Sequence, residues 1–355
     1  MTSPRPAAGL RAGANPPAAA DAPGTDPRTP ATGPGGRPVP PAPAGPPDVV
    51  AAGVICWRPA RDGRLEVLMV HRAGPDEWGW PSGVPERRES LAECAVRQAT
   101  EKAGTDVVLG RPLTPVRCLP EDGGREDVTY WAARPGRPGP PAKATSQAVD
   151  DVRWVPFEAA ADQLARTADN APLQSLAGYA GDGTLATTAT LVVRHATARP
   201  RDAWARADAD RPLVASGKRQ ALALGALLQC WRPEQVISSP WRRCLDTMAP
   251  YLALSGARLR TKSGLSEAGH RRSPAKATRH LRQLLESPRG GALCTHRPVL
   301  GDVLAAVRDW CTPEAAPLVP RTNPYLHPGD VLVAHATRRP GSHPLVVAVE
   351  RHGTR

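Results

Sequence analysis

Aromatic residues are scarce in this 355-residue sequence, which has one Phe and four Tyr beside nine Trp. No block of Lys and Arg alternates with aromatic side chains, so a nucleic-acid partner is not favoured. Long hydrophobic runs are also lacking. None approaches the roughly 20 apolar residues that cross a bilayer, which argues against a membrane protein or membrane partner. We also expect no secretory signal, because no apolar segment follows the first arginine.

Lysine is rare among the basic residues, with five of the 46 Lys and Arg, and the formal net charge is +12. An excess of arginine suits phosphate-bearing partners, because a guanidinium group binds phosphate oxygens through two parallel hydrogen bonds. A composition bias shared with the abundant Ala and Pro accounts for the same excess without any function. Both interpretations remain open from the sequence.

The seven cysteines form no Cys-x-x-Cys pair and no Cys/His spacing typical of a metal site. An odd and scattered set of cysteines predicts reduced thiols and a cytoplasmic protein.

Residues 1–47 contain 14 of the 42 prolines and are otherwise rich in Ala, Gly, Arg and Asp. With almost no large apolar residue, this segment cannot offset the entropy of ordering it, so we predict a disordered tail. The remaining about 308 residues suffice for two compact cores.

A change of pattern near residues 177–184, a predicted linker, divides the rest into domains 48–177 and 185–355. The first is strand-rich, with one clear helix over 89–103. The second alternates strands and helices, which predicts an α/β layer fold with a mainly parallel sheet. Its predicted strands are 185–193, 235–238, 292–295, 331–335 and 345–349, and its predicted helices are 217–228, 241–253, 275–286 and 298–310.

Polar side chains follow three predicted strands of the second domain. Arg194 and His195 end the first, Arg243 follows the second, and His296 follows the third. Ligands of open α/β sheets bind beyond the carboxyl ends of strands, so we expect these four side chains in one crevice. Arg-His also occurs at 279–280, within a predicted helix, and at 351–352, too near the end for a helix to follow.

These segments resemble the histidine phosphatases related to phosphoglycerate mutase, in the phosphohistidine-phosphatase branch. The resemblance covers Leu191 to about Val307 and keeps the family's order of motifs. The matching motifs are 192–197, 211–213, 238–243, 265–267 and 294–296.

The resemblance implies that a neutral His195 attacks phosphorus and forms a phosphohistidine that water hydrolyses. Arg194, Arg243 and His296 would stabilise the charge on the phosphoryl oxygens, and Glu267 would donate a proton to the leaving group. No metal or other cofactor is needed for this chemistry. The alternative is a structural role for each: an arginine in a salt bridge, a capping histidine and a solvated glutamate.

Gly83, Glu89, Arg97, Glu101 and Gly104 stand at the spacing of the Nudix box, and the resemblance covers roughly 47–176. Gly83, Arg97 and Gly104 would be structural, while Glu89 and Glu101 would hold Mg²⁺.

Two of the Nudix-box positions depart from the pattern, because Gln98 and Lys102 replace expected glutamates. Together they shift the site by three units of positive charge, which would repel a metal ion. Three hypotheses follow: a degenerate domain that binds a nucleotide or supports its neighbour, residual catalysis through Glu101, Glu89 and Glu93, or a helix whose charges are only solvated.

The sequence as a whole resembles fusions of a MutT-type Nudix hydrolase with a histidine phosphatase. This implies a Nudix-like mixed-sheet α/β/α sandwich followed by a three-layer α/β/α domain, and a phosphohydrolase acting on nucleotide phosphates. Oxidised guanine nucleotides, as in 8-oxo-dGTP diphosphatases, and dinucleoside polyphosphates are the implied substrates. Two alternatives stay open: a phosphatase of phosphohistidine on a protein, and a regulator whose Nudix domain binds a nucleotide without hydrolysing it.

Overall fold

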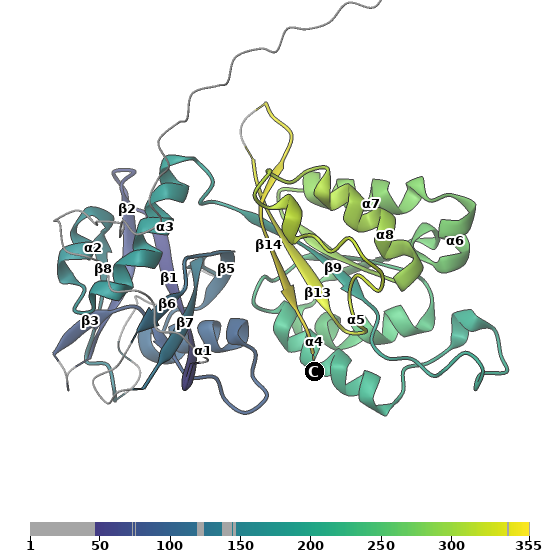
Figure 1. The fold of residues 1–355 in the computed structure, drawn as a ribbon, viewed down its shortest axis with the longest axis horizontal. Coiled ribbons are helices and arrows are strands. Elements are labelled where there is room, and N and C mark those ends of the chain that lie inside the picture. Colours follow the sequence, from purple (N-terminus) through teal and green to yellow (C-terminus); the bar gives the residue numbers. More distant parts are fainter. Residues whose placement is uncertain are drawn as a thin grey trace, which may run out of the picture. The chain divides into compact units, whose positions relative to one another are not determined.

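The computed structural model describes residues 47–72, 74, 76–118, 124–136, 144, 147–338 and 341–354 (Figure 1). They lie within one compact unit, Pro43–Arg355. The predicted tail over 1–47 lies outside the described residues, apart from its last residue. In the described part of the chain, no helix has both the length and the apolar character needed to span a bilayer.

The first sheet has eight strands built around β1 (Val49–Pro59). β1 pairs in parallel with β7 (Glu126–Pro135) and antiparallel with β2 (Leu65–Arg72), so the sheet is mixed, as predicted. Its main path is β3-β2-β1-β7-β5, and β4, β6 and β8 pair with β1, β7 and β2. The other strands are β3 (Glu77–Gly79), β4 (Ser82–Gly83), β5 (Val107–Pro112), β6 (Val116–Cys118) and β8 (Asp151–Pro156).

Both faces of this sheet are covered because successive residues of a strand point to opposite sides. Val54 of β1 packs in one buried cluster with Ala95, whereas Ile55 belongs to another with Leu176. The predicted sandwich is therefore confirmed. Its helices are α1 (Leu91–Ala103), α2 (Phe157–Gln163) and α3 (Asn170–Gly181).

Helix α1 is bounded by local signals in its sequence. Ser90 caps its start through a capping box with Glu93, and Gly104 ends it with a left-handed φ of 58°. The predicted start at Glu89 is two residues early, because the capping residue Ser90 keeps an extended backbone.

The second sheet has the order β11-β10-β12-β9-β13-β14. The three strands whose ends carry the candidate residues are parallel neighbours: β9 (Thr188–Arg194), β12 (Gly291–Thr295) and β10 (Gln235–Ser238). These parallel pairs confirm the prediction of a mainly parallel sheet, although β13 runs antiparallel to β9. The remaining strands are β11 (Arg258–Thr261), β13 (Val331–Thr337) and β14 (Leu345–His352).

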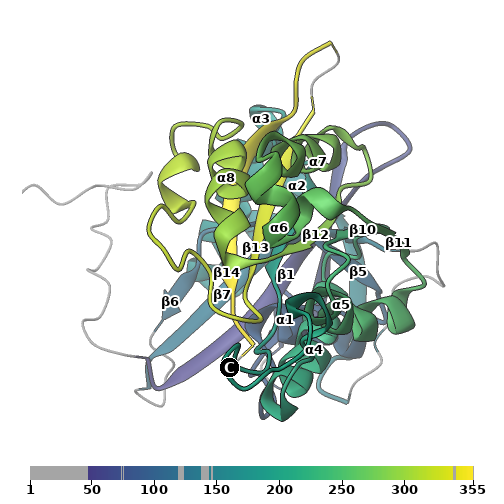
Figure 2. The same cartoon turned by 90° about the vertical axis from the view of Figure 1, so that its right-hand side faces the viewer.

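Helices cover both faces of the second sheet, which gives the predicted three layers (Figure 1 and Figure 2). Val193 of β9 packs in the cluster that holds Leu224 of α4 and Met248 of α5. Val192 faces the opposite side, in the cluster with Leu281 of α7 and Leu304 of α8. The helices are α4 (Ala215–Leu228), α5 (Arg242–Ser255), α6 (Glu267–Arg272), α7 (Ala275–Glu286) and α8 (Arg297–Arg308).

The predicted linker over 177–184 is partly wrong, because α3 continues through Ala177 to Gly181. Leu173 and Leu176 bury one side of this helix, and their packing outweighs the weak helix preference of its glycines. The strand predicted from Leu185 begins at Thr188.

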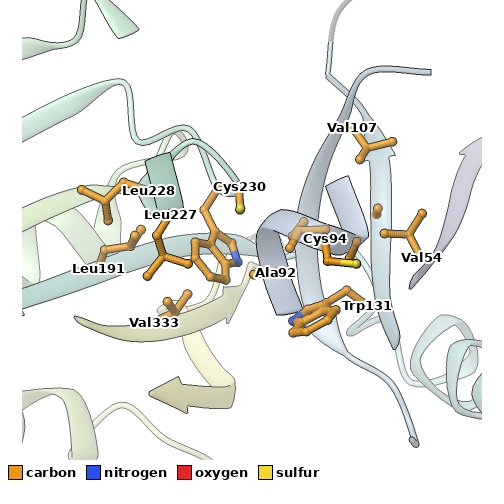
Figure 3. Close-up of a cluster of buried hydrophobic side chains, with 14 of the residues drawn as sticks. Val54, Ala92, Cys94, Val107, Trp131, Leu191, Leu227, Leu228, Cys230 and Val333 are labelled. Atoms are coloured by element: carbon orange, nitrogen blue, oxygen red, sulfur yellow. The ribbon is translucent and has the colours of Figure 1, made fainter. Parts of the chain in front are cut away.

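One buried cluster contains side chains of both sheets (Figure 3). Trp131 of β7 and Ala92 of α1 belong to it, as do Leu227 of α4 and Cys230, which follows α4. The Leu109 amide donates a hydrogen bond of 2.9 Å to the Cys230 carbonyl. The two sheets therefore share a continuous apolar core.

Candidate active site

His195 follows β9 directly and lies against the ends of two other strands. Its amide donates to the carbonyl of Thr295, the last residue of β12, over 3.0 Å. Its ring lies edge-on to that of His296, with centroids 5.1 Å apart. The parallel arrangement of β9, β10 and β12 thus brings together the residues that the sequence placed at three strand ends.

The hydrogen bonds of the His195 ring define its tautomer. Nδ1 lies 2.8 Å from the Ala196 carbonyl, which only accepts, so Nδ1 carries the hydrogen. Nε2 accepts from Nε of Arg243 over 3.3 Å and keeps its lone pair. Burial, with the positive charges of Arg243 and Arg194, lowers the pKa of His195 to about 3.

His296 is fully buried and also neutral. Its Nδ1 accepts from Nε of Arg243 over 3.2 Å, so Nε2 carries the hydrogen and donates to Oγ of Ser239 over 2.8 Å. Burial lowers the pKa of His296 well below its ordinary value, and the neighbouring His195 and Arg243 lower it further.

Arg243, the second residue of α5, is completely buried and connects both histidines. Its Nη1 donates to the backbone carbonyl of Asp208 over 2.8 Å, and its Nη2 donates to Oε1 of Glu267 over 2.8 Å. Its guanidinium also lies 4.5 Å above the ring of Trp241. This packing holds the guanidinium in one position beside Nε2 of His195.

Arg194 is half-buried beside His195 and has unused donors. Its Nη1 donates to the Leu326 carbonyl over 2.6 Å, whereas its buried Nε has no partner among the described residues. Unpaired buried donors are costly, so this group is suited to an anion that enters the site.

Glu267 is the first residue of α6 and accepts hydrogen bonds from two arginines. Nη2 of Arg243 donates to Oε1 over 2.8 Å, and Nη2 of Arg201 donates to Oε2 over 3.0 Å. The carboxylate lies 3.8 Å from Nδ1 of His296. In this arrangement Glu267 is an acceptor, whereas the resemblance implied a proton donor.

Three further charged residues lie in the site and were not predicted from the sequence: Arg201, Asp208 and Arg211. All lie between β9 and α4, and Asp208 pairs with Arg211 at 2.7 Å, Arg201 at 3.2 Å and Arg243 at 3.3 Å. In the sequence, the three-residue spacing of Asp208 and Arg211 was the available signal for this ion pair. Asp208 partly neutralises the cations that surround His195.

A cavity of about 390 Å³ opens onto His195. Guanidinium groups, Glu267 and two prolines contribute to its wall, together with Thr197 and Ala198. A second cavity of about 320 Å³ shares Arg201 and Glu267 with the first and includes Trp241 in its wall. The lining arginines of the first cavity are Arg194, Arg201, Arg211 and Arg297.

The backbone after His195 is held from α4 and α5. Oε1 of Gln220 accepts from the Thr197 amide, and Oγ1 of Thr247 accepts from the Ala196 amide, both over 2.9 Å. A Cβ at Gly217 would lie 1.9 Å from the Thr197 carbonyl, so the close approach of α4 requires glycine there.

The two other Arg-His pairs lie elsewhere. His280 is in α7 beside Gln283, and His352 of β14 contacts Glu350 and the ring of Trp231. Neither lines the cavity at His195.

In the first sheet, the two candidate metal ligands are engaged by Arg97 of α1. Its Nε and Nη2 contact both oxygens of Glu89 at 2.8 and 2.7 Å, and its Nη1 contacts Glu101 at 2.8 Å. Burial opposes ionisation of Glu89, but the bonds from Arg97 outweigh it and lower the pKa of this carboxyl. Glu93 is used in the cap of α1.

The two replacements of the Nudix pattern face the strand β4. The Lys102 ammonium donates to the Ser82 carbonyl, and burial together with the charge of Arg72 lowers the pKa of Lys102 to about 8. Gln98 is buried beside Gly83, and its Oε1 has no partner among the described residues.

These residues do not fit a divalent cation. No group of three or more His, Cys, Asp or Glu side chains in the described ranges could hold a metal ion. Protein sites for Mg²⁺ use one or two carboxylates, but here both glutamates pair with an arginine and the Lys102 ammonium adds a positive charge near Glu101.

Two models of protein families match the chain, one over each of the two sheets. A model of the NUDIX domain matches residues 47–176, and a model of the histidine phosphatase superfamily, branch 1, matches residues 190–308. A relative from Mycolicibacterium smegmatis, named 8-oxo-(d)GTP phosphatase, is 30% identical over 283 residues, which cover 77% of this chain and 84% of the relative.

Similar solved structures include an Ap4A hydrolase from C. elegans, 20% identical, with a TM-score of 0.35, covering 38% of this chain and 98% of that one. A Nudix hydrolase from M. smegmatis, RenU, is 23% identical, with a TM-score of 0.33, covering 38% of this chain and 86% of that one.

The chain belongs to the proteins that join a Nudix domain to a histidine phosphatase domain. Both families are hydrolases, so the protein is a hydrolase of phosphoester or phosphoanhydride bonds.

Proposed function

We propose that this hydrolase removes a phosphate from nucleotides through a phosphohistidine on His195. The observation that carries the proposal is the state of its ring: Nδ1–H is fixed on a carbonyl, and the lone pair of Nε2 faces Arg243. An imidazole that stays neutral at physiological pH is a nucleophile, and a guanidinium beside it binds the phosphoryl oxygens.

In the first step, the lone pair of Nε2 forms a bond to phosphorus while the bond from phosphorus to the leaving oxygen breaks. Arg194 and Arg243 stabilise the negative charge on the transferred oxygens, and His296 holds Arg243 in place. The electron pair of the broken bond leaves with the oxygen. His195 becomes the phosphohistidine.

In the second step, water attacks phosphorus and the bond to Nε2 breaks, which returns its lone pair and releases phosphate. Glu267 is the carboxylate beside the reacting position and accepts the proton of the attacking water. No step in this scheme uses a metal ion or another cofactor.

Guanine nucleotides, including oxidised ones, are the proposed substrates. The support is the name of the M. smegmatis relative and the cationic cavity, which suits a chain of phosphates. Dinucleoside polyphosphates carry the same phosphoanhydride chemistry. The alternative substrate is a phosphohistidine on a partner protein.

For the first domain, proposed as 48–177, the departures at Gln98 and Lys102 favour binding over hydrolysis. The ammonium of Lys102 beside the Ser82 carbonyl supplies a positive charge without Mg²⁺. The domain over 185–355 is then the catalyst, and the nucleotide bound by the first domain either regulates it or supplies its substrate.

A cytoplasmic location is proposed from the thiols. Six cysteines of the described residues are free, which fits a reducing compartment.

The test is release of phosphate from GTP, 8-oxo-dGTP, a dinucleoside polyphosphate and a histidine-phosphorylated carrier protein. We expect the wild-type chain to act on the nucleotides and His195→Ala to lose at least about a thousandfold in kcat. Equal nucleotide turnover by His195→Ala would contradict the proposal. Turnover of the carrier protein alone would assign the alternative.

A further inference from the structure

Arg297 occupies a distinct position at the mouth of the site. It is the residue after His296 and the first residue of α8, and its exposed side chain lines the 390 Å³ cavity that opens onto His195. His296, the N-cap of α8, is buried, whereas the next residue, Arg297, is exposed at the cavity.

Arg297, like Arg194, has no ion pair with an acidic group, in contrast to the two other arginines of the wall. Arg201 and Arg211 pair with Asp208, and Arg201 also pairs with Glu267. Within the described residues, Arg297 has no ion-pair or hydrogen-bond partner. A cation without a counterion at a cavity wall is available to a ligand.

A second arginine lies close to Arg297. Burial lowers the pKa of Arg194, and the positive charge of Arg297 lowers it further, so the two guanidinium groups repel each other. Nε of Arg194 also lacks a partner among the described residues. An anion between the two groups would relieve the repulsion.

The charge of the wall exceeds what one phosphate needs. Four arginines and one glutamate line the cavity, a net of three positive charges, and Asp208 offsets the charge of the buried Arg243 beneath them. A phosphate monoester brings about two negative charges, whereas the second phosphate of a diphosphate brings more.

The contacts of Glu267 favour a phosphoanhydride as the substrate. Both of its oxygens accept from arginines, so in this arrangement it has no proton to give to a leaving group. An alkoxide leaving from an ester needs a proton. A phosphate leaving from an anhydride is stable as an anion and does not.

We propose that Arg297, together with Arg194, binds the phosphate next to the one that reacts, so that the site selects the terminal phosphate of a nucleoside di- or triphosphate over a monophosphate. This proposal rests on the proposed function of His195. Arg297 is then a specificity-determining residue: it holds the leaving phosphate and takes no part in the attack.

The test uses Arg297→Gln, with Arg282→Gln as the matched control, because Arg282 is an exposed arginine of α7 that does not line the cavity. The assay is hydrolysis of p-nitrophenyl phosphate, corrected for the rate of His195→Ala, with methylenediphosphonate or phosphate as inhibitor. We expect Arg297→Gln to weaken inhibition by methylenediphosphonate about 10- to 100-fold and inhibition by phosphate less than about threefold. Arg282→Gln should change neither.

The substrate side of the test compares GDP with GMP. Arg297→Gln should lower the His195-dependent kcat/KM for GDP by the same about 10- to 100-fold and leave that for GMP nearly unchanged. Equal losses on both nucleotides, or no loss on either, would overturn the role of Arg297 while leaving His195 as the nucleophile. An absence of His195-dependent hydrolysis in the wild-type chain would instead overturn the proposed function, and this inference with it.

Discussion

At the scale of single residues, the protonation of His195 is decided by its surroundings. The ring is partly buried among arginines, with one nitrogen fixed on the Ala196 carbonyl and the other facing Arg243. Desolvation and the nearby positive charges penalise the imidazolium form, and together they outweigh the bond to the Ala196 carbonyl, which favours it. In the proposed function, His195 is thus in its nucleophilic form before any substrate binds.

The neutral ring predicts a measurable titration. With its pKa lowered to about 3, His195 should stay neutral from pH 8 down to about pH 5, whereas an ordinary histidine titrates near 6.5. NMR of the chain labelled at histidine Cε1, with His195→Ala to assign the resonance, measures this directly. A midpoint near pH 6.5 for His195 would contradict the structure.

The contacts of Arg243 depend on the planar shape of its guanidinium group. Its Nε contacts both histidines while its two terminal nitrogens contact Asp208 and Glu267, and lysine has no such planar fork. We expect Arg243→Lys to lower kcat about 100- to 1000-fold, the range typical of losing one preorganised donor. Steady-state kinetics on a nucleotide measures it, with Arg242→Lys, the exposed neighbour, as the control. A loss below about tenfold would argue against this role.

At the scale of elements, helix α1 keeps the form of a Nudix helix while its charges have changed. Arg97 joins Glu89 and Glu101, and Lys102 contacts the Ser82 carbonyl where an acidic side chain is expected. The cap at Ser90 and the end at Gly104 are intact. The helix therefore tolerates the changed charges at positions 98 and 102, because its stability comes from packing and capping.

The poor fit of these residues to a divalent cation predicts a gain in a double variant. Gln98→Glu with Lys102→Glu adds three units of negative charge beside Glu101 and should bind Mg²⁺ or Mn²⁺ more tightly than the wild-type chain does. Calorimetric titration of both chains with Mn²⁺ measures it. Tight binding of Mn²⁺ by the wild-type chain would contradict the structure.

The sequence predicted this arrangement of elements well where a local rule applied. The strands over 235–238 and 292–295 and the helix over 275–286 lie within a residue of their predicted bounds, and parallel strands bring their carboxyl ends together, so His195 and His296 meet. Asp208 was missed as part of the site, because only its three-residue spacing from Arg211 pointed to it and the segment between β9 and α4 carries it there. Helix α3 was missed beyond Leu176, since tertiary packing extends it.

At the scale of the whole molecule, the carboxylate of Glu350 links residues far apart in the sequence. Nε1 of Trp131 donates to Oε2 of Glu350 over 2.8 Å, and Nε2 of His335 lies 2.6 Å from the other oxygen. Burial alone would raise the pKa of Glu350, but the contacts with His335 and His352 outweigh it and lower the pKa to about 2. No sequence pattern pointed to a contact across more than 200 positions.

The lowered pKa of Glu350 predicts a pH-dependent stability. Its contribution is complete above the unfolded pKa of 4.5 and is lost as pH falls from 4.5 toward 2. Glu350→Gln should therefore lower the free energy of unfolding by about 3 kcal/mol at pH 7 and by much less near pH 3.

Urea unfolding at both pH values measures this difference. Glu286→Gln, at an exposed position of α7, is the control and should change the free energy by less than about 0.5 kcal/mol. An equal effect of Glu350→Gln at pH 7 and pH 3 would show that its charge does not stabilise the fold.

The most direct test of the account is to trap the covalent intermediate during turnover. The chain is incubated with GTP labelled with ³²P at the terminal phosphate, quenched in alkali and mapped by peptide mass spectrometry. The proposed function predicts an acid-labile phosphoryl group on His195 that is absent from His195→Ala. Turnover of GTP with no label on His195, or with the label on another residue, would contradict it.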